Sequence, residues 1–344
     1  MTRRDIIGIG GSSGSTEALK TLVAGLAAGL QASVLISTHI SGRKTYLVEV
    51  LKRFSPLPVR VAQDGEEILP GIVYVAAPDA HLLALDGRFK LGRGPRENMA
   101  RPAIDPMLRS LALSYGPRAI GVILSGALND GASGLLAVKQ CGGLAVVQSP
   151  EDAQVTEMPC AAIQEAQPDH IVPANAIGPL LSDLVGAEAP AAPACPPDVR
   201  LEVEIAAGGP LGAERLERLA DPVAMTCPNC HGVLSHVREG GPLRYRCQIG
   251  HAVTGEILDQ TQKAAQEEAL RIALRVVEER ADLVRTMGKD ARRLGRTAVA
   301  EIYEAREKEY AAHAQVLRKA VLAGLLSIME NDPTSDSAAA PEPK

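Results

Sequence analysis

Aromatic residues and an excess of positive charge are both lacking, and this argues against nucleic acid as a partner. The 344 residues include no Trp, two Phe and six Tyr, and the formal net charge is −5. Proteins that bind single strands stack bases on aromatic rings, and proteins that bind duplexes neutralise phosphates with Lys and Arg. Because the chain has little of either, we expect no nucleic-acid partner.

Long apolar runs and a signal peptide are also lacking. The nearest candidate for a membrane span, residues 22–36, is interrupted by two glycines and Gln31, whereas a spanning helix needs about 20 mostly apolar residues in succession. The arginines at the N-terminus are followed by Asp5 rather than by the apolar core of a signal peptide. We therefore expect a cytoplasmic protein without membrane insertion. In that reducing compartment its six cysteines are expected to be free or metal-bound rather than in disulfides.

The first half of the chain has the pattern of a parallel α/β sheet. Short apolar runs alternate with helical patterns, and several runs lack any polar residue, as in strands covered on both faces. The expected strands are 5–10, 33–38, 71–76, 121–125 and 144–148. Residues 67–91 differ, because Pro-Gly and Asp-Gly pairs divide them into the pieces of an antiparallel hairpin. The pattern predicts a doubly wound, mostly parallel, Rossmann-like sheet with a β-hairpin excursion.

The second half begins with a Pro/Ala-rich segment after residue 187, which is typical of a linker. A compact Cys/His region follows. Beyond it, apolar residues recur at spacings of three and four, which predicts helix, and Gly288 and Gly295 are expected to mark the turn of a helical hairpin. The predicted parts are an α/β catalytic domain at 1–187, a linker at 188–222, a zinc ribbon at 223–254, a helical hairpin at 255–328 and a disordered tail at 329–344.

A glycine-rich turn lies between the first strand and the first helix, with the sequence Gly10-Gly11-Ser12-Ser13-Gly14. A G-x-S-x-G turn can hold a serine nucleophile, and a glycine-rich turn can also cradle a phosphate. A dinucleotide site would need a third glycine and a ribose-binding acid, and a P-loop would need a lysine; the sequence has none of these at the required offsets. A turn that only packs the helix on the strand is an equally acceptable interpretation of this segment alone.

Two further strand ends support the nucleophile. His39 follows the second expected strand, and Asp130 follows the strand at 121–125. Because the carboxyl ends of parallel strands converge on one crevice, we expect Ser12, His39 and Asp130 to meet there. A histidine can take the serine proton, and a carboxylate can orient the imidazole. Each residue by itself also has a structural explanation. His39 could be a hydrogen-bonded structural histidine, and Asp130 could belong to an Asp-Gly turn or cap a helix.

At this point the sequence resembles the chemotaxis receptor methylesterases of the CheB type. Residues 8–19 match the family's A-I-G-A-S-T-G-G-P-E-A-L, residues 38–40 match its histidine segment, and residues 124–131 match its L-T-G-M-G-x-D-G. Further matches occur in the same order, at 64–76, 78–81, 101–105 and 158–159. The resemblance covers about residues 4–186.

The resemblance implies a Ser-His-Asp esterase that needs no catalytic cofactor. Ser12 would be the nucleophile, His39 the general base and acid, and Asp130 the orienting acid. The backbone N–H of Ser13 or Ala127 would form the oxyanion hole. The implied substrate is a γ-glutamyl methyl ester on the cytoplasmic helices of a methylated chemoreceptor, and the implied products are glutamate and methanol. The family also deamidates receptor glutamines.

Several departures from the family pattern support an alternative interpretation. Ala127 stands where the family has methionine, Leu128 where it has glycine, and Ser15-Thr16 where it has Gly-Pro. The alternative is a catalytically weak regulatory or interaction protein that retains the methylesterase fold. The family usually also begins with a receiver domain, which these residues do not include, so we expect control by a separate receiver or kinase protein or by the C-terminal module.

Four residues in the second half have the spacing of a zinc ribbon. Cys227 and Cys230 form a C-x2-C pair, and Cys247 and His251 follow 16 residues later as C-x3-H. Four protein ligands close a tetrahedron round one Zn²⁺, so the zinc is expected to be structural. His231 and His236 compete with His251 as the fourth ligand. The remaining cysteines, Cys141, Cys160 and Cys195, are expected to be ordinary residues.

Overall fold

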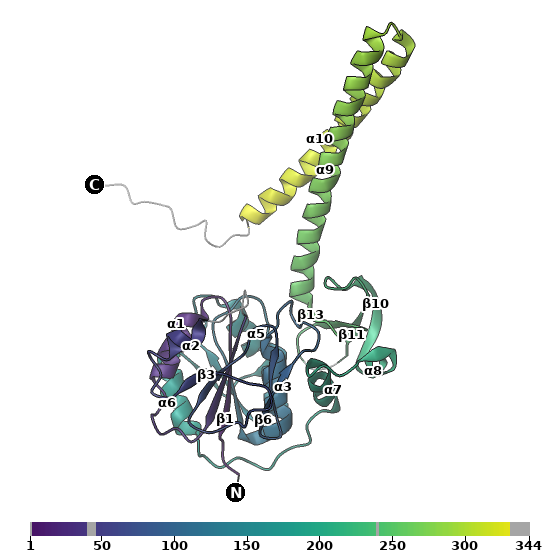
Figure 1. The fold of residues 1–344 in the computed structure, drawn as a ribbon. Coiled ribbons are helices and arrows are strands. Elements are labelled where there is room, and N and C mark those ends of the chain that lie inside the picture. The colour runs from purple at the N-terminus through teal and green to yellow at the C-terminus, as the bar shows by residue number, and fades with distance from the viewer. Residues whose placement is uncertain (1, 40–45, 239–240, 331–344) are drawn as a thin grey trace, which may run out of the picture. The chain divides into compact units, whose positions relative to one another are not determined.

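The computed structural model describes residues 2–39, 46–238 and 241–330, and side chains up to residue 323. It divides into two compact units, Met1–Leu258 and Asp259–Lys344. Figure 1 shows the α/β domain and a small second sheet in the first unit, and long helices in the second.

The main sheet has seven parallel strands in the order β3-β4-β2-β1-β7-β8-β9. Their bounds are β1 (Ile6–Gly11), β2 (Ser33–Thr38), β3 (Val59–Val61), β4 (Val73–Val75), β7 (Ala119–Ile123), β8 (Leu144–Gln148) and β9 (His170–Val172). The predicted parallel, doubly wound fold is confirmed. Strand β1 lies between β2 and β7, so the chain changes direction across the sheet at this strand. A ligand crevice in such sheets forms at the carboxyl ends of the strands beside that switch point.

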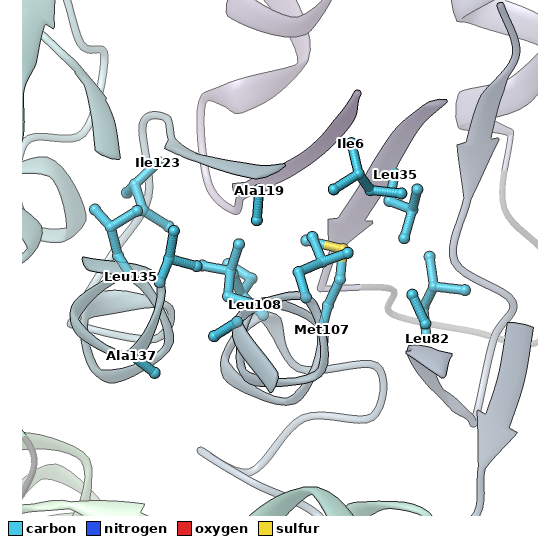
Figure 2. Close-up of a cluster of buried hydrophobic side chains, with 14 of the residues drawn as sticks. Ile6, Leu35, Leu82, Met107, Leu108, Ala119, Ile123, Leu135 and Ala137 are labelled. Carbon is cyan, nitrogen blue, oxygen red and sulfur yellow. The ribbon is translucent and has the colours of Figure 1, made fainter. Parts of the chain in front are cut away.

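Helices cover both faces of this sheet (Figure 1). One face packs against α1 (Ser15–Ala24), α2 (Leu47–Leu51) and α6 (Ala174–Leu184), and the other against α3 (Ile104–Tyr115), α4 (Ala132–Gln140) and α5 (Glu157–Ala166). Figure 2 shows Leu108 of α3 and Leu135 of α4 directed at Ala119 and Ile123 of β7. Burial on both faces explains why these strands lack polar alternation. A short 3-10 turn, Gly116–Arg118, leads from α3 into β7.

The predicted hairpin forms from β5 (His81–Leu85) and β6 (Arg88–Gly92), which pair antiparallel. Its turn residues Asp86 and Gly87 have φ values of 49° and 76°. Positive φ at both central residues is the requirement of the tight hairpin turn that an Asp-Gly pair favours.

The segment predicted as a linker, 188–222, contains two helices, α7 (Pro197–Ala206) and α8 (Gly212–Leu219). Residues Val199 and Val203 of α7 are buried. Before α7, Cys195 forms a disulfide with Cys141, with a Cα–Cα distance of 4.9 Å. The expectation that all cysteines are free or metal-bound was wrong for this pair, because the Pro-rich segment returns along the α/β domain, where Pro193 lies beside Gly142. Cys160 is free and exposed.

The small sheet of the first unit is antiparallel, in the order β10-β11-β12-β13. Its strands are β10 (Ala220–Thr226), β11 (Val233–Val237), β12 (Arg244–Cys247) and β13 (Ala252–Thr254). We call residues 220–258 the ribbon. Its apolar cluster holds Leu234, Val253, Ile257 and Leu258 around the buried Cys227 and Cys247.

Two long helices follow, α9 (Gly255–Arg293) and α10 (Thr297–Glu330), and α9 begins in the first unit. Gly295, with φ 73°, lies in the turn between them as expected, whereas Gly288 lies within α9. A Cβ on Gly288 would lie 3.5 Å from Tyr303 Cβ, an ordinary van der Waals distance, so the packing of the two helices does not require glycine there. No helix in the described ranges is long and apolar enough to cross a membrane. The predicted tail at 329–344 lies, from residue 331 onward, outside the described residues.

Candidate active site and metal site

Ser12 follows β1 directly and is held by backbone contacts on both sides. Its N–H donates to Ser125 O at 2.9 Å, and its carbonyl accepts from the Ser15 hydroxyl at 2.6 Å. Gly14 has φ 75°, and a Cβ there would lie 2.8 Å from Ser125 Oγ and Gln154 Cβ. The turn therefore requires glycine at this position.

The three residues expected from the strand ends lie together. Ser12 Oγ is 2.9 Å from His39 Nδ1, and His39 Nε2 is 2.7 Å from Asp130 Oδ2. The serine faces Nδ1 and the acid faces Nε2, which is the reverse of the ring orientation in chymotrypsin. Both nitrogens lie at the edge of one planar ring, so this orientation still connects hydroxyl, imidazole and carboxylate in a single chain of hydrogen bonds.

Asp130 is buried and accepts several hydrogen bonds. Besides His39, its donors are the Ile104 N–H at 2.7 Å, the Asn98 side-chain amide at 2.9 Å and the Asp105 N–H at 3.3 Å. Burial opposes its charge, but the hydrogen bond and charge of His39 and the donors at Ile104 and Asn98 lower its pKa to about 2. Two of these donors are backbone groups at the start of α3, where a helix favours a negative charge. Asp130 is therefore a carboxylate at neutral pH.

Asn98 and Asp105 are site residues that no motif in the sequence indicates. The Asn98 amide also lies 3.3 Å from Asp105 Oδ2, so it bridges the two carboxyl groups. Burial and the neighbouring charge of Asp130 raise the pKa of Asp105 to about 7. Both residues fall in or beside the matched segment 101–105, but nothing in their spacing indicated that they contact Asp130.

The loop after β7 carries the second predicted oxyanion donor, Ala127. The loop is fixed on both sides, by Gly126 N–H to Val155 O at 3.1 Å and by Leu128 N–H to Glu157 Oε2 at 2.6 Å. A Cβ on Gly126 would lie 3.1 Å from Ser12 Cβ, which places the loop against the nucleophile. Among the described residues, the N–H groups of Ser13 and Ala127 have no acceptor. Both donors are therefore available to a substrate oxygen.

Four predicted metal ligands lie together in the ribbon. The thiols of Cys227, Cys230 and Cys247 and a ring nitrogen of His251 all lie within 4.8 Å of one another. Cys230 Sγ and Cys247 Sγ are 3.6 Å apart, and Cys247 Sγ is 3.6 Å from His251 Nδ1. This group could hold a metal ion. In the part of the chain that the structure describes, neither competing histidine, His231 or His236, belongs to it.

A buried cluster of charged residues joins the α/β domain to α7 and the ribbon. Arg109 of α3 pairs with Glu97 at 2.5 Å and with Glu202 of α7 at 2.8 Å. Arg246 of β12 contacts the same two glutamates at 3.2 and 3.1 Å, and Arg244 contacts Glu202 at 2.8 Å. The attraction of these arginines outweighs burial and lowers the pKa of both glutamates. Separating these partners would leave an uncompensated buried charge, which is strongly unfavourable. The cluster therefore holds α3, α7 and the ribbon together.

Comparison with known proteins assigns a family to the α/β domain. The family model of the CheB methylesterase matches residues 7–181. The catalytic domain of a CheB methylesterase from Thermotoga maritima has a similar structure, with a TM-score of 0.51 and 35% identity over 53% of this chain and 98% of that domain.

Two curated relatives are similar over the same region. A protein of Leptospira interrogans named putative protein-glutamate methylesterase/protein-glutamine glutaminase is 37% identical over 178 residues, which are 51% of this chain and 92% of that protein. A protein-glutamate methylesterase/protein-glutamine glutaminase of Bdellovibrio bacteriovorus is 34% identical over 188 residues, 53% of this chain and 53% of that protein. The chain belongs to the CheB methylesterase family and is a hydrolase that acts on esters, as the resemblance in its sequence predicted.

Proposed function

We propose that this chain removes methyl groups from γ-glutamyl methyl esters on chemoreceptor helices in the cytoplasm, as part of chemotaxis signalling. The observation that supports this most directly is the hydrogen-bonded chain Ser12–His39–Asp130. The names of the relatives, protein-glutamate methylesterase/protein-glutamine glutaminase, supply the substrate class. Control by a separate receiver or kinase protein belongs to the same proposal.

In the first half of the reaction, Ser12 Oγ attacks the ester carbonyl carbon while its proton moves to His39 Nδ1. The carboxylate of Asp130 stabilises the imidazolium that forms. The oxyanion accepts hydrogen bonds from the N–H groups of Ser13 and Ala127. The intermediate then expels methoxide, which takes the proton from His39 and leaves as methanol.

In the second half, water replaces methanol. His39 takes a proton from the water as it attacks the acyl-serine, and returns that proton to Ser12 Oγ when the glutamate leaves. A glutamine side chain can follow the same route, with ammonia leaving in place of methanol. The proposal therefore includes deamidation without any additional group.

Methanol release tests the proposal. The full chain would be incubated with membranes that contain a methylated chemoreceptor, and methanol would be measured over time beside Ser12→Ala and an unmethylated receptor. We expect release only from wild type with methylated receptor. If wild type and Ser12→Ala release the same negligible amount, the chain instead retains the fold as a regulatory or interaction protein, which is the alternative that Ala127 and Leu128 favour.

The acid side of the pH profile is expected to report His39. Burial favours the neutral ring, but the hydrogen bond and charge of Asp130 outweigh it and raise the pKa of His39. Only neutral His39 can take the serine proton, so activity is present above this pKa and is lost as the pH falls through it. We expect kcat/KM for methanol release to fall about tenfold per pH unit, beginning above the ordinary histidine value of about 6.5. A limb that begins clearly below that value would contradict the role of Asp130.

We further propose that the ribbon group binds one structural Zn²⁺ through Cys227, Cys230, Cys247 and His251. Sulfur and nitrogen ligands at tetrahedral angles around zinc lie about 3.5–3.8 Å apart, and two ligand pairs of this group are each 3.6 Å apart. Thiolate and imidazole ligands suit zinc, and four of them leave no open position for catalysis.

Zinc content and thermal unfolding test this site. We expect about one zinc per chain by elemental analysis, and a lower Tm after chelation, because binding to a structural site contributes directly to folding. Cys247→Ser should lose the metal. Cys160→Ser is the matched control, because it removes a free, exposed thiol elsewhere in the chain. A metal-free protein that unfolds at the same temperature as the zinc-loaded one would refute the proposal.

A further inference from the structure

The ribbon holds the residue beside the catalytic acid through two hydrogen bonds. Thr254 Oγ1, at the end of β13, donates to Asn129 Oδ1 at 2.7 Å. Asn129 Nδ2 donates to Glu256 Oε2 at 2.6 Å. The side chains of Asn129 and Thr254 are buried, with 4% and 0% exposure. Both ends of the Asn129 amide therefore bind the ribbon, and the next residue along the chain is Asp130.

The same strand also holds the amide that donates to Asp130. Ala252 O accepts from the Asn98 N–H at 2.8 Å, and Ala252 N–H donates to Arg96 O at 3.2 Å. The Asn98 side chain then donates to Asp130 Oδ1 at 2.9 Å. Strand β13 thus contacts the segments that contain Asn98 and Asn129. Both segments lead to the Asp130 carboxylate, although they are far apart in sequence.

Leu128 provides a third connection, which is apolar. It packs against the ribbon cluster that contains Val253 and Ile257. Its φ of 61° lies in the left-handed region, where a leucine persists only when its surroundings hold it. Leu128 replaces a glycine of the family pattern, so packing on the ribbon offers a physical reason for a side chain at this position.

We propose that the ribbon is a working part of the active site, in which Leu128, Thr254 and Glu256 are positioning residues for the loop 127–130. This inference rests on the proposed Ser-His-Asp mechanism. The loop carries two groups that act in the transition state, the Ala127 N–H and the Asp130 carboxylate. Ser12 is fixed separately, by Ser125 and the helix turn. Loosening the ribbon contact should therefore slow the chemical step more than it weakens substrate binding.

Substitution of Thr254 separates this role from a merely structural one. We expect Thr254→Val, which keeps the shape and removes the hydroxyl, to lower kcat by about 10- to 100-fold with KM changed less than about threefold, because small displacements of catalytic groups have effects of this size. Thr254→Ser should restore most of the lost rate. Thr286→Val, an exposed residue of α9, is the matched control. Equal kcat for Thr254→Val and wild type would overturn the proposal.

A second measurement does not depend on the substrate. A fluorophosphonate reacts when Ser12 Oγ attacks phosphorus, fluoride leaves and the serine proton passes to His39, so its labelling rate reports the triad and oxyanion hole directly. We expect slower labelling of Thr254→Val and recovery in Thr254→Ser. Wild type that is labelled at Ser12 but releases no methanol would contradict the proposed substrate, and the labelling rates would still decide the inference.

Two further variants keep the proposal testable if Thr254→Val unfolds. Glu256 is exposed, so Glu256→Ala should leave Tm and zinc content unchanged while it slows labelling, and Glu256→Gln, which retains an acceptor, should recover the rate. Leu128→Gly removes the energetic cost of a leucine in the left-handed backbone region. It also removes the side chain that packs on the ribbon. We expect it to slow labelling about tenfold or more. Wild-type labelling rates in both Glu256→Ala and Leu128→Gly would show that the ribbon contact has no catalytic role.

Discussion

Ser12→Ala is expected to lower kcat for methanol release by about 10⁶-fold, and His39→Ala by a similar factor, as for a serine and histidine that act as one unit. The hydrogen bond of 2.9 Å between Ser12 Oγ and His39 Nδ1 is the reason, because either substitution prevents proton transfer from the attacking oxygen. The double variant should be no slower than either single one. Single-turnover assays with purified variants would measure all three rates.

A matched control distinguishes loss of the nucleophile from a general effect of removing a hydroxyl. Ser114→Ala removes an exposed serine of α3 and should keep the wild-type rate. If Ser12→Ala retains hydrolysis within about tenfold of wild type, another group is the nucleophile. If the double variant is much slower than both single variants, the two residues act independently, and the triad mechanism is wrong.

The meeting of Ser12, His39 and Asp130 could be predicted because it depends on topology alone. The three residues follow β1, β2 and β7, which are neighbours in one parallel sheet. Apolar runs identified these strands, and their carboxyl ends converge by construction. The family pattern added the roles. The short strands β3 and β9, of three residues each, were not predicted, since so few residues carry no clear periodicity.

The surroundings of the triad could not be predicted, because their contacts join residues that are distant in sequence. Arg246 contacts Glu97 across 149 positions, and Asn129 contacts Glu256 across 127. Nothing in the sequence distinguishes Glu202 from the solvent-exposed glutamates that are common on helices. Only folding shows that it is buried between Arg109 and Arg244. The same folding brings the ribbon, predicted as a separate domain, into one compact unit with the α/β domain.

These buried contacts suggest why a chain of this family carries a ribbon. The arginine–glutamate cluster secures the ribbon and α7 to α3, and α3 supplies two backbone donors to Asp130. Strand β13 then reaches the loops on both sides of the same carboxylate. The ribbon therefore contacts the segments that hold Asp130. We expect any effect of the ribbon on the reaction rate to act through the position of this carboxylate.

Asp130→Asn is expected to lower kcat by about 10⁴-fold, as the corresponding change does in the chymotrypsin-type triad. The carboxylate now accepts the Nε2–H of His39, at 2.7 Å, and so leaves Nδ1 free to take the serine proton. Oδ1 accepts from Asn98, and Oδ2 accepts from the Ile104 N–H as well as from His39, so the NH2 of an amide at 130 would face a hydrogen-bond donor in either orientation. The amide also carries no negative charge to stabilise the imidazolium that forms when His39 takes the serine proton.

The same substitution removes the charge that raises the pKa of His39. The acid limb of kcat/KM should therefore move to lower pH while the plateau falls. Asp105→Asn is the comparison, because Asp105 is the neighbouring buried carboxyl but contacts neither nitrogen of His39. Burial and the charge of Asp130 raise its pKa to about 7, so the substitution removes less negative charge than Asp130→Asn does, and a much smaller loss is expected. Equal losses in the two variants would mean that Asp130 acts only through its buried hydrogen bonds to Asn98 and the start of α3, and not by orienting His39.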